Sequence, residues 1–134
     1  MSRKLFVNLP VSDLDRSVTF FTALGFTFDP NFTDENATCM VVNDDTSVML
    51  LVQPFFSTFT TKAIADTGSH AEAIMAIGAD SREEVDDLVD RALAAGGTPF
   101  NDKDDQGFMY GGSFQDPDGH LWEVIYMDQS QMPT

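Results

Sequence analysis

Hydrophobic positions along the chain follow two periods, and the change from one period to the other occurs twice. Residues 4–9 alternate between apolar and polar side chains, which predicts a strand that ends at Pro10. Ser12 and Asp13 then offer N-cap chemistry for a helix that runs to about Leu24. The apolar face of this helix consists of Leu14, Val18 and Phe21. After the helix-ending Gly25, further strands are predicted at residues 26–28, 37–42 and 47–52, the last two forming a hairpin.

The second half of the chain repeats this order. Residues 72–79 predict a strand, and Ser81 with Glu84 forms a capping box at the start of a helix. Gly96 and Gly97 end that helix. Its predicted apolar face consists of Val85, Leu88, Val89, Ala92 and Leu93. Three more strands are predicted at residues 98–101, 108–114 and 121–126, with a turn at residues 116–119 between the last two.

Residues 53–68 between the two halves have no clear period. Pro54 and several Ser and Thr residues favour a connection, with at most a helical turn. Apolar side chains are less expected in a connection, yet Phe55, Phe56 and Phe59 fall here. Two interpretations stay open for these rings, which are a cover over a cleft and a dimer contact.

The repeated order of strand, helix, glycine and further strands predicts the fold class. It indicates an α+β fold of two βαβββ modules, about residues 1–66 and about residues 69–128, within one domain of residues 1–134. A module that cannot close its own sheet explains the duplication. We expect the two curved mixed sheets to form a cleft.

Composition narrows the classes of function. The chain has 7 basic and 22 acidic residues and a net charge of −15, which argues against nucleic acid and against an anionic membrane surface. No apolar run is long enough to span a bilayer and no signal peptide is visible, so we expect a cytoplasmic protein. The one cysteine, Cys39, lies in a predicted strand, which favours a packed thiol over a nucleophile.

Two segments resemble the vicinal oxygen chelate superfamily, which includes glyoxalases, bleomycin-resistance proteins and extradiol dioxygenases. Residues 7–26, with the sequence VNLPVSDLDRS and then FF and LGF, are similar to that superfamily's opening strand and helix. Residues 114–124, FQDPDGHLWEV, are similar to its closing hairpin. The resemblance implies a glyoxalase-like fold, a homodimer, and a divalent metal bound by His or Glu side chains in the cleft.

The metal-ligand positions of the superfamily carry mostly inert residues in this chain. They fall at Phe6, near Leu50 or Leu51, near Ile74, and at Glu123, of which only Glu123 can bind a metal. We therefore expect no cofactor, with a divalent metal as the alternative if Glu123 is joined by Glu72 and one histidine. Both histidines, His70 and His120, are predicted to be exposed.

The resemblance and the ligand count together predict a metal-free cleft that binds a small apolar or aromatic molecule. Its expected lining is Phe6, Asn8, Leu50, Ile74, Tyr110 and Glu123. The alternative is a metal-dependent glyoxalase- or dioxygenase-like enzyme, a lyase or oxidoreductase acting on a small oxygenated metabolite. A third alternative is a structural or regulatory dimer without a ligand.

Overall fold

The computed structural model describes residues 3–131 of the chain and divides it into two compact units. Unit one comprises Met1–Ala65 and unit two comprises Asp66–Thr134. Each unit contains a four-stranded mixed sheet and a long helix, so the predicted α+β class with two βαβββ modules is confirmed.

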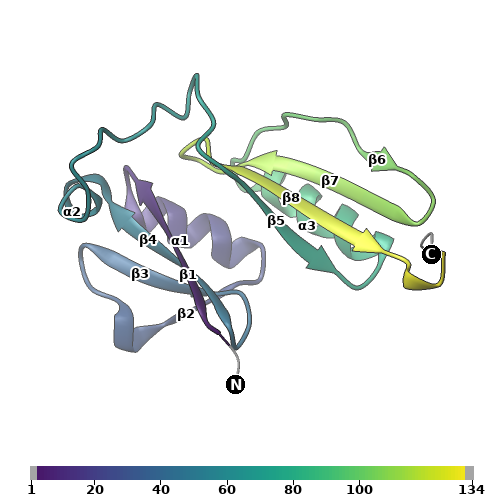
Figure 1. The fold of residues 1–134 in the computed structure, drawn as a ribbon, viewed down its shortest axis with the longest axis horizontal. Coiled ribbons are helices and arrows are strands. Elements are labelled where there is room, and N and C mark those ends of the chain that lie inside the picture. Colours follow the sequence, from purple (N-terminus) through teal and green to yellow (C-terminus); the bar gives the residue numbers. More distant parts are fainter. Residues whose placement is uncertain (1–2, 132–134) are drawn as a thin grey trace. The chain divides into compact units, whose positions relative to one another are not determined.

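Unit one consists of β1 (Leu5–Val11), α1 (Leu14–Ala23), β2 (Thr27–Asp29), a 3₁₀ turn (Pro30–Phe32), β3 (Ala37–Val41), β4 (Thr46–Val52) and the short α2 (Gln53–Phe56). Its sheet has the order β1-β4-β3-β2, in which only the pair of β1 and β4 is parallel. Figure 1 shows α1 along one face of this sheet. The helical turn that was predicted in the connection is confirmed by α2.

Local chemistry sets the ends of α1. The backbone N–H of Arg16 donates to Asp13 Oδ1 at 3.1 Å, which caps the helix, and Gly25 adopts a φ of 99° just after it. Between these ends, Phe20 and Phe21 are each only 1% exposed and pack edge to face. The prediction that β1 ends at Pro10 is wrong, because β1 is an edge strand, where a residue without an N–H is tolerated.

Unit two consists of β5 (Ile74–Ala79), α3 (Arg82–Ala94), β6 (Asp104–Asp105), β7 (Met109–Gln115), β8 (Leu121–Met127) and a 3₁₀ turn (Gln129–Gln131). Its sheet has the order β5-β8-β7-β6, with β5 parallel to β8. Figure 1 shows α3 along one face of this sheet. Ser81 caps α3 as predicted, because the N–H of Glu84 donates to Ser81 Oγ at 3.1 Å.

Two predictions for unit two are wrong. The predicted strand at residues 98–101 is reduced to a single bridge between Thr98 and Gln115, because Pro99 has no N–H with which to continue a ladder. The pairing resumes only at β6. Leu93, expected on the buried face of α3, is 39% exposed, because the helix buries the narrower stripe of Val85, Val89 and Ala92.

The predicted turn at residues 116–119 is present and is held by one buried carboxylate. Asp116 accepts hydrogen bonds from the backbone of Asp118 and His120 and from Trp122 Nε1, at 2.9 to 3.1 Å. Burial nevertheless raises the pKa of Asp116. Gly119 closes the turn with a φ of 83°. The turn thereby fixes the start of β8, the strand that carries Glu123.

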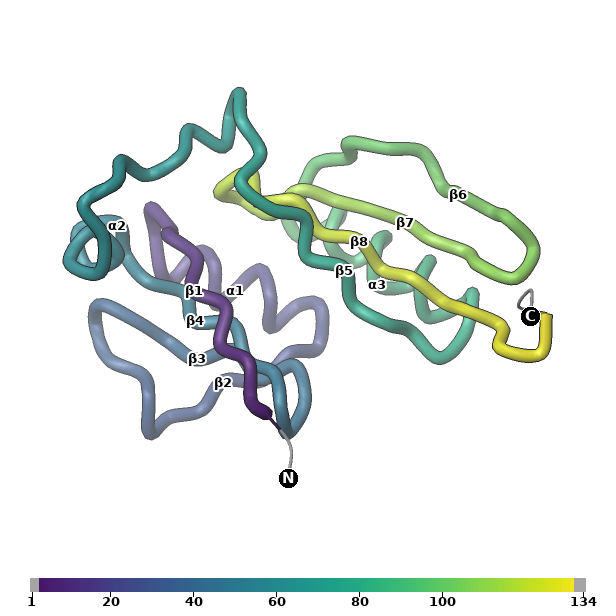
Figure 2. Tube along the Cα trace, viewed as in Figure 1, coloured from purple at the N-terminus to yellow at the C-terminus, as the bar shows by residue number. Residues whose placement is uncertain are grey.

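The remaining expectations concern Cys39, the connection and the membrane. Cys39 is 3% exposed in β3, as predicted for a packed thiol. Figure 2 traces the connection between α2 and β5, which contains neither helix nor strand. Within residues 3–131, no helix is long and apolar enough to cross a membrane.

Candidate functional site

The pairing of β1 with β4 shows which predicted residues of unit one share a face. Side chains that pair across a ladder point to the same face, and neighbours along a strand point to opposite faces. Leu9 and Val11 point to the buried face of the sheet. Phe6 and Asn8 point to the opposite face, where Phe6 is 54% exposed. Leu50 pairs with the buried Leu9 and is 0% exposed, so its prediction as a lining residue is wrong. Met49, one position earlier, pairs with Asn8 and shares its face.

In unit two the face opposite α3, called the open face from here on, carries Glu123. Ser113 and Ala76 pair with Glu123 from the two neighbouring strands. Ile74 lies on the same open face and is 54% exposed. The sheet therefore presents a carboxylate, a hydroxyl and an aliphatic side chain on one surface.

The prediction that Tyr110 lies in the cleft is wrong. Tyr110 pairs with Tyr126 on the α3 side of the sheet, and its hydroxyl donates to Asp86 Oδ1 of α3 at 2.6 Å. The ladder of β7 and β8 is regular from Met109 to Gln115, and of the two neighbouring glycines only Gly112 lies on this α3 side. A Cβ on Gly112 would lie 2.8 Å from Val89 Cγ2.

A hollow of about 390 Å³ lies on the open face around Glu123. Its floor consists of Met109, Gly111, Ser113, Glu123 and Ile125, and its wall of residues 101–104. A larger hollow of about 540 Å³ beside β5 contains Asp80 and Tyr126 as its only ionisable residues. We take the smaller hollow as the candidate site, because it contains Glu123 and converging polar groups.

Carboxylates dominate the charge around this hollow. Asp102, Asp104 and Glu123 line it, whereas its one cation, Lys103, forms an ion pair with Asp86 of α3. The site therefore suits ligand groups that donate hydrogen bonds or carry positive charge. No periodic pattern in the sequence relates residues 102–105 to Glu123, so sequence reasoning does not bring them together.

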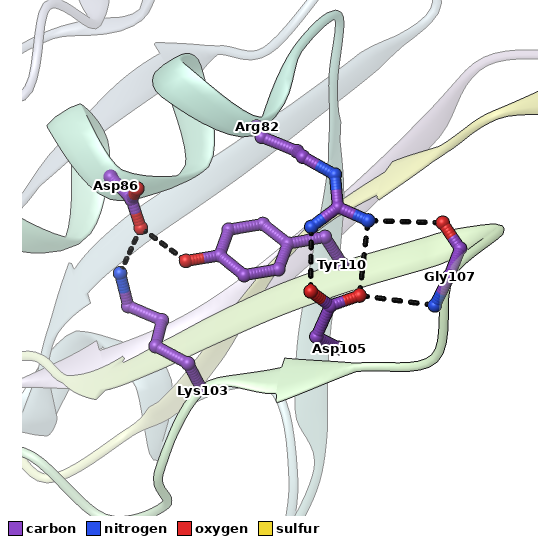
Figure 3. A network of polar contacts seen from close by, with 6 residues as sticks. All are labelled: Arg82, Asp86, Lys103, Asp105, Gly107 and Tyr110. Carbon is purple, nitrogen blue, oxygen red and sulfur yellow. Dashed lines mark hydrogen bonds and ion pairs between the residues drawn. The ribbon is translucent and has the colours of Figure 1, made fainter.

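A network of ion pairs and hydrogen bonds joins α3 to the segment that bears the wall (Figure 3). Arg82 donates to both carboxylate oxygens of Asp105, at 2.8 and 3.0 Å, and to the backbone oxygen of Gly107 at 3.0 Å. The hydrogen bond from Arg82 lowers the pKa of Asp105 to about 2. Lys103, followed by Tyr110, lowers the pKa of Asp86, and Asp86 in turn raises the pKa of Tyr110.

The two histidines occupy different environments. His70 is exposed, as predicted, and its Nδ1 lies 2.7 Å from Ser69 Oγ. The prediction that His120 is exposed is wrong, because it is 1% exposed and its Nδ1 lies 2.6 Å from Glu72 Oε1. Glu72 is 48 positions away in the sequence, so no local pattern could have revealed this pair.

The donor set does not fit a metal centre. Phe6, Leu50 and Ile74 offer hydrocarbon where the superfamily supplies metal ligands, and a divalent ion needs several oxygen, nitrogen or sulfur donors. The alternative set is not assembled either. Across residues 3–131, no group of three or more His, Cys, Asp or Glu side chains is placed to hold a metal ion.

Comparisons with known proteins agree with this fold. Residues 3–43 match the family model described as bleomycin resistance protein-like N-terminal. A hypothetical protein from S. aureus is 27% identical, with a TM-score of 0.80 over 94% of each chain. A glyoxalase/bleomycin resistance protein/dioxygenase family enzyme from Burkholderia phytofirmans PsJN is 16% identical, with a TM-score of 0.75 over 91% of this chain and 96% of that one.

A bleomycin resistance determinant encoded on the transposon Tn5 is 18% identical, with a TM-score of 0.66 over 95% of this chain and 99% of that one. No curated protein sequence is significantly similar to the chain. The match over residues 3–43 and the shared fold make this chain similar to glyoxalase, bleomycin-resistance and dioxygenase proteins.

Proposed function

We propose that this chain binds a small apolar or aromatic molecule and does so without a metal. One observation carries the proposal. Three of the four positions at which the superfamily supplies metal ligands hold hydrocarbon side chains, and two of these, Phe6 and Ile74, are each 54% exposed. Glu123 is the only matched position with a side chain able to bind a metal.

The exposed Ile74 on the open face of unit two, which also carries Glu123, favours a ligand with an apolar body. Covering exposed hydrocarbon stabilises a complex by about 25 cal/mol per Å² of apolar area removed from water. The carboxylate of Glu123 adds direction, because it accepts a hydrogen bond from a hydroxyl, amine or amide group on the ligand. A ring or aliphatic body with one donor group matches both features.

The rival function is a metal-dependent lyase or dioxygenase. Solved structures similar to this chain include one named lactoylglutathione lyase, from Agrobacterium tumefaciens, and one named bleomycin resistance determinant. The fold is therefore compatible with both classes of function. The choice between them rests on the donor set of this chain, which favours metal-free binding.

A thermal-shift screen tests the proposal. Untagged protein is screened against small aromatic and aliphatic compounds in the presence of EDTA, because a ligand of the native state raises its melting temperature. Hits are then titrated by calorimetry against Glu123→Gln and against Glu83→Gln, which removes the same charge from the exposed start of α3.

We expect Glu123→Gln to weaken binding about tenfold or more, since a hydrogen bond to a charged group contributes about 1.5–3 kcal/mol. Glu83→Gln should bind as the wild type does. The proposal fails if EDTA abolishes every hit and a divalent metal restores binding or produces turnover.

A further inference from the structure

We propose that Arg82 and Tyr110 are positioning residues that set the shape and charge of the hollow by holding its wall to α3. This inference deepens the proposed binding function and rests on it. Neither residue lines the hollow. Both act on residues 101–107, called the wall segment from here on, which supply the wall and the turn that follows it.

Side chains of the wall segment alternate between two roles. Asp104 pairs with Gly111 on the open face, whereas Asp105 pairs with Tyr110 on the face that meets α3. Asp102, Lys103 and Asp104 line the hollow, whereas the side chains of Lys103 and Asp105 form ion pairs with α3. Because neighbouring residues of a strand point in opposite directions, fixing Asp105 on the α3 side fixes Asp104 on the open face.

Two residues of α3 hold the segment at two points. Arg82 and Asp86 are four positions apart and so lie on the same side of the helix. Arg82 binds Asp105 through two parallel hydrogen bonds and also binds the backbone oxygen of Gly107. Asp86 binds Lys103. A bidentate guanidinium–carboxylate pair restricts orientation more strongly than a single contact does.

Tyr110 links these two points. Its ring lies between the two cations, with the Arg82 guanidinium 4.9 Å and the Lys103 ammonium 5.7 Å from the ring centroid. Its hydroxyl donates to the same Asp86 oxygen that binds Lys103 (Figure 3). Tyr110 therefore supports both contacts from the sheet side, while its backbone pairs with Asp105.

Little else holds the wall segment in place. All seven of its residues are exposed, and its strand β6 is only two residues long. The other contacts are few: Gln106 donates its N–H to the Met109 oxygen at 2.8 Å, and Ser113 Oγ donates to the Asn101 oxygen at 3.3 Å. A short exposed segment with few buried contacts opens readily unless side chains restrain it.

Hydrogen exchange tests the restraint without any ligand. Arg82→Gln and Tyr110→Phe are compared with Arg91→Gln, because Arg91 forms an ion pair with Asp87 within α3 and not with the wall segment as the structure describes it. We expect amides of the wall segment to exchange at least about threefold faster in the first two variants and unchanged in the third. Equal exchange in all three variants would overturn the inference.

Two matched probes test the effect on the hollow. 1-Naphthylmethylamine and 1-naphthalenemethanol share a ring system and differ in charge, so the carboxylates of the hollow should favour the amine. We expect that preference to fall at least about threefold in Arg82→Gln and Tyr110→Phe, and to persist in Arg91→Gln. A general loss of stability would weaken both probes alike and leave the ratio unchanged.

The outcomes separate this inference from the proposed function. Faster exchange with an unchanged probe ratio shows that the restraint exists but does not shape the hollow, which contradicts the inference. If neither probe nor any screened compound binds the wild type, the proposed function fails and the role in ligand selection fails with it. The exchange result then still decides whether α3 holds the wall segment.

Discussion

Replacing Gly112 with alanine tests whether the close approach of α3 to β7 depends on a missing side chain. The added Cβ would lie 2.8 Å from Val89 Cγ2 and 3.2 Å from the Lys103 stem. Carbon atoms in favourable contact are about 3.5–4.0 Å apart. The Lys103 stem can move, but Val89 is a stiff, β-branched residue that is 4% exposed.

The expected cost follows from two opposing effects. Overpacking a buried contact typically costs about 1–3 kcal/mol. Against this, alanine in a strand is more favourable than glycine by about 0.5–1 kcal/mol. Gly112→Ala should therefore lower the free energy of unfolding by about 1–2 kcal/mol. Gly78→Ala is the matched control, because its Cβ would meet nothing within 4 Å, and it should be neutral or slightly stabilising.

Urea unfolding of four variants measures this effect. Val89→Ala removes the obstructing methyl group, so the double variant with Gly112→Ala should lose less stability than the two single variants added together, by about 1 kcal/mol. Strict additivity, or equal stabilities of Gly112→Ala and Gly78→Ala, would refute the account of how β7 and α3 pack.

Two further predictions use the turns and the ion pair. Gly119→Ala should lower the free energy of unfolding in urea by about 1–2 kcal/mol more than Gly107→Ala does. Both glycines have a positive φ, but only at Gly119 would an added Cβ lie close to a neighbour, 2.9 Å from the Thr67 oxygen. Equal losses of stability would contradict this. A carboxyl-carbon NMR titration should give Asp105 a pKa of about 2 that returns toward its ordinary value in Arg82→Gln. The pKa of Asp105 is lower in the folded than in the unfolded wild type, so the wild type should be more stable than Arg82→Gln above about pH 4. This difference in the free energy of unfolding should shrink as the pH falls toward about 2. A difference that does not depend on pH would contradict the assignment.

Most of the fold could be predicted from the sequence, because short-range chemistry determines it. The caps at Asp13 and Ser81 and the turn that ends at Gly119 each depend on residues within a few positions of one another. Failures occurred where a distant or missing group decided the structure. Pro99 has no N–H to donate to a ladder, so the strand predicted at residues 98–101 does not form. The pairing with β7 is made by β6 instead, in a segment that has no strand pattern.

The candidate site was less accessible to prediction for two physical reasons. The face that a side chain occupies depends on the phase of its strand, and an offset of one residue reverses it, as at Leu50. In β7 the sequence does not indicate which residues face α3, because Gly111 and Gly112 carry no side chains. The prediction therefore places Tyr110 on the wrong face. The pair of His120 and Glu72 and the wall around Glu123 depend on tertiary contacts alone.

The absence of a resident metal is the central claim, and a direct titration tests it. Untagged protein, cleared with EDTA and dialysed, is titrated by calorimetry with Fe(II), Mn(II), Ni(II) and Zn(II), and its metal content is then measured by mass spectrometry. We expect less than stoichiometric metal and the same weak heat for the wild type and Glu123→Gln. One tightly bound ion per chain, lost in Glu123→Gln, would contradict the account.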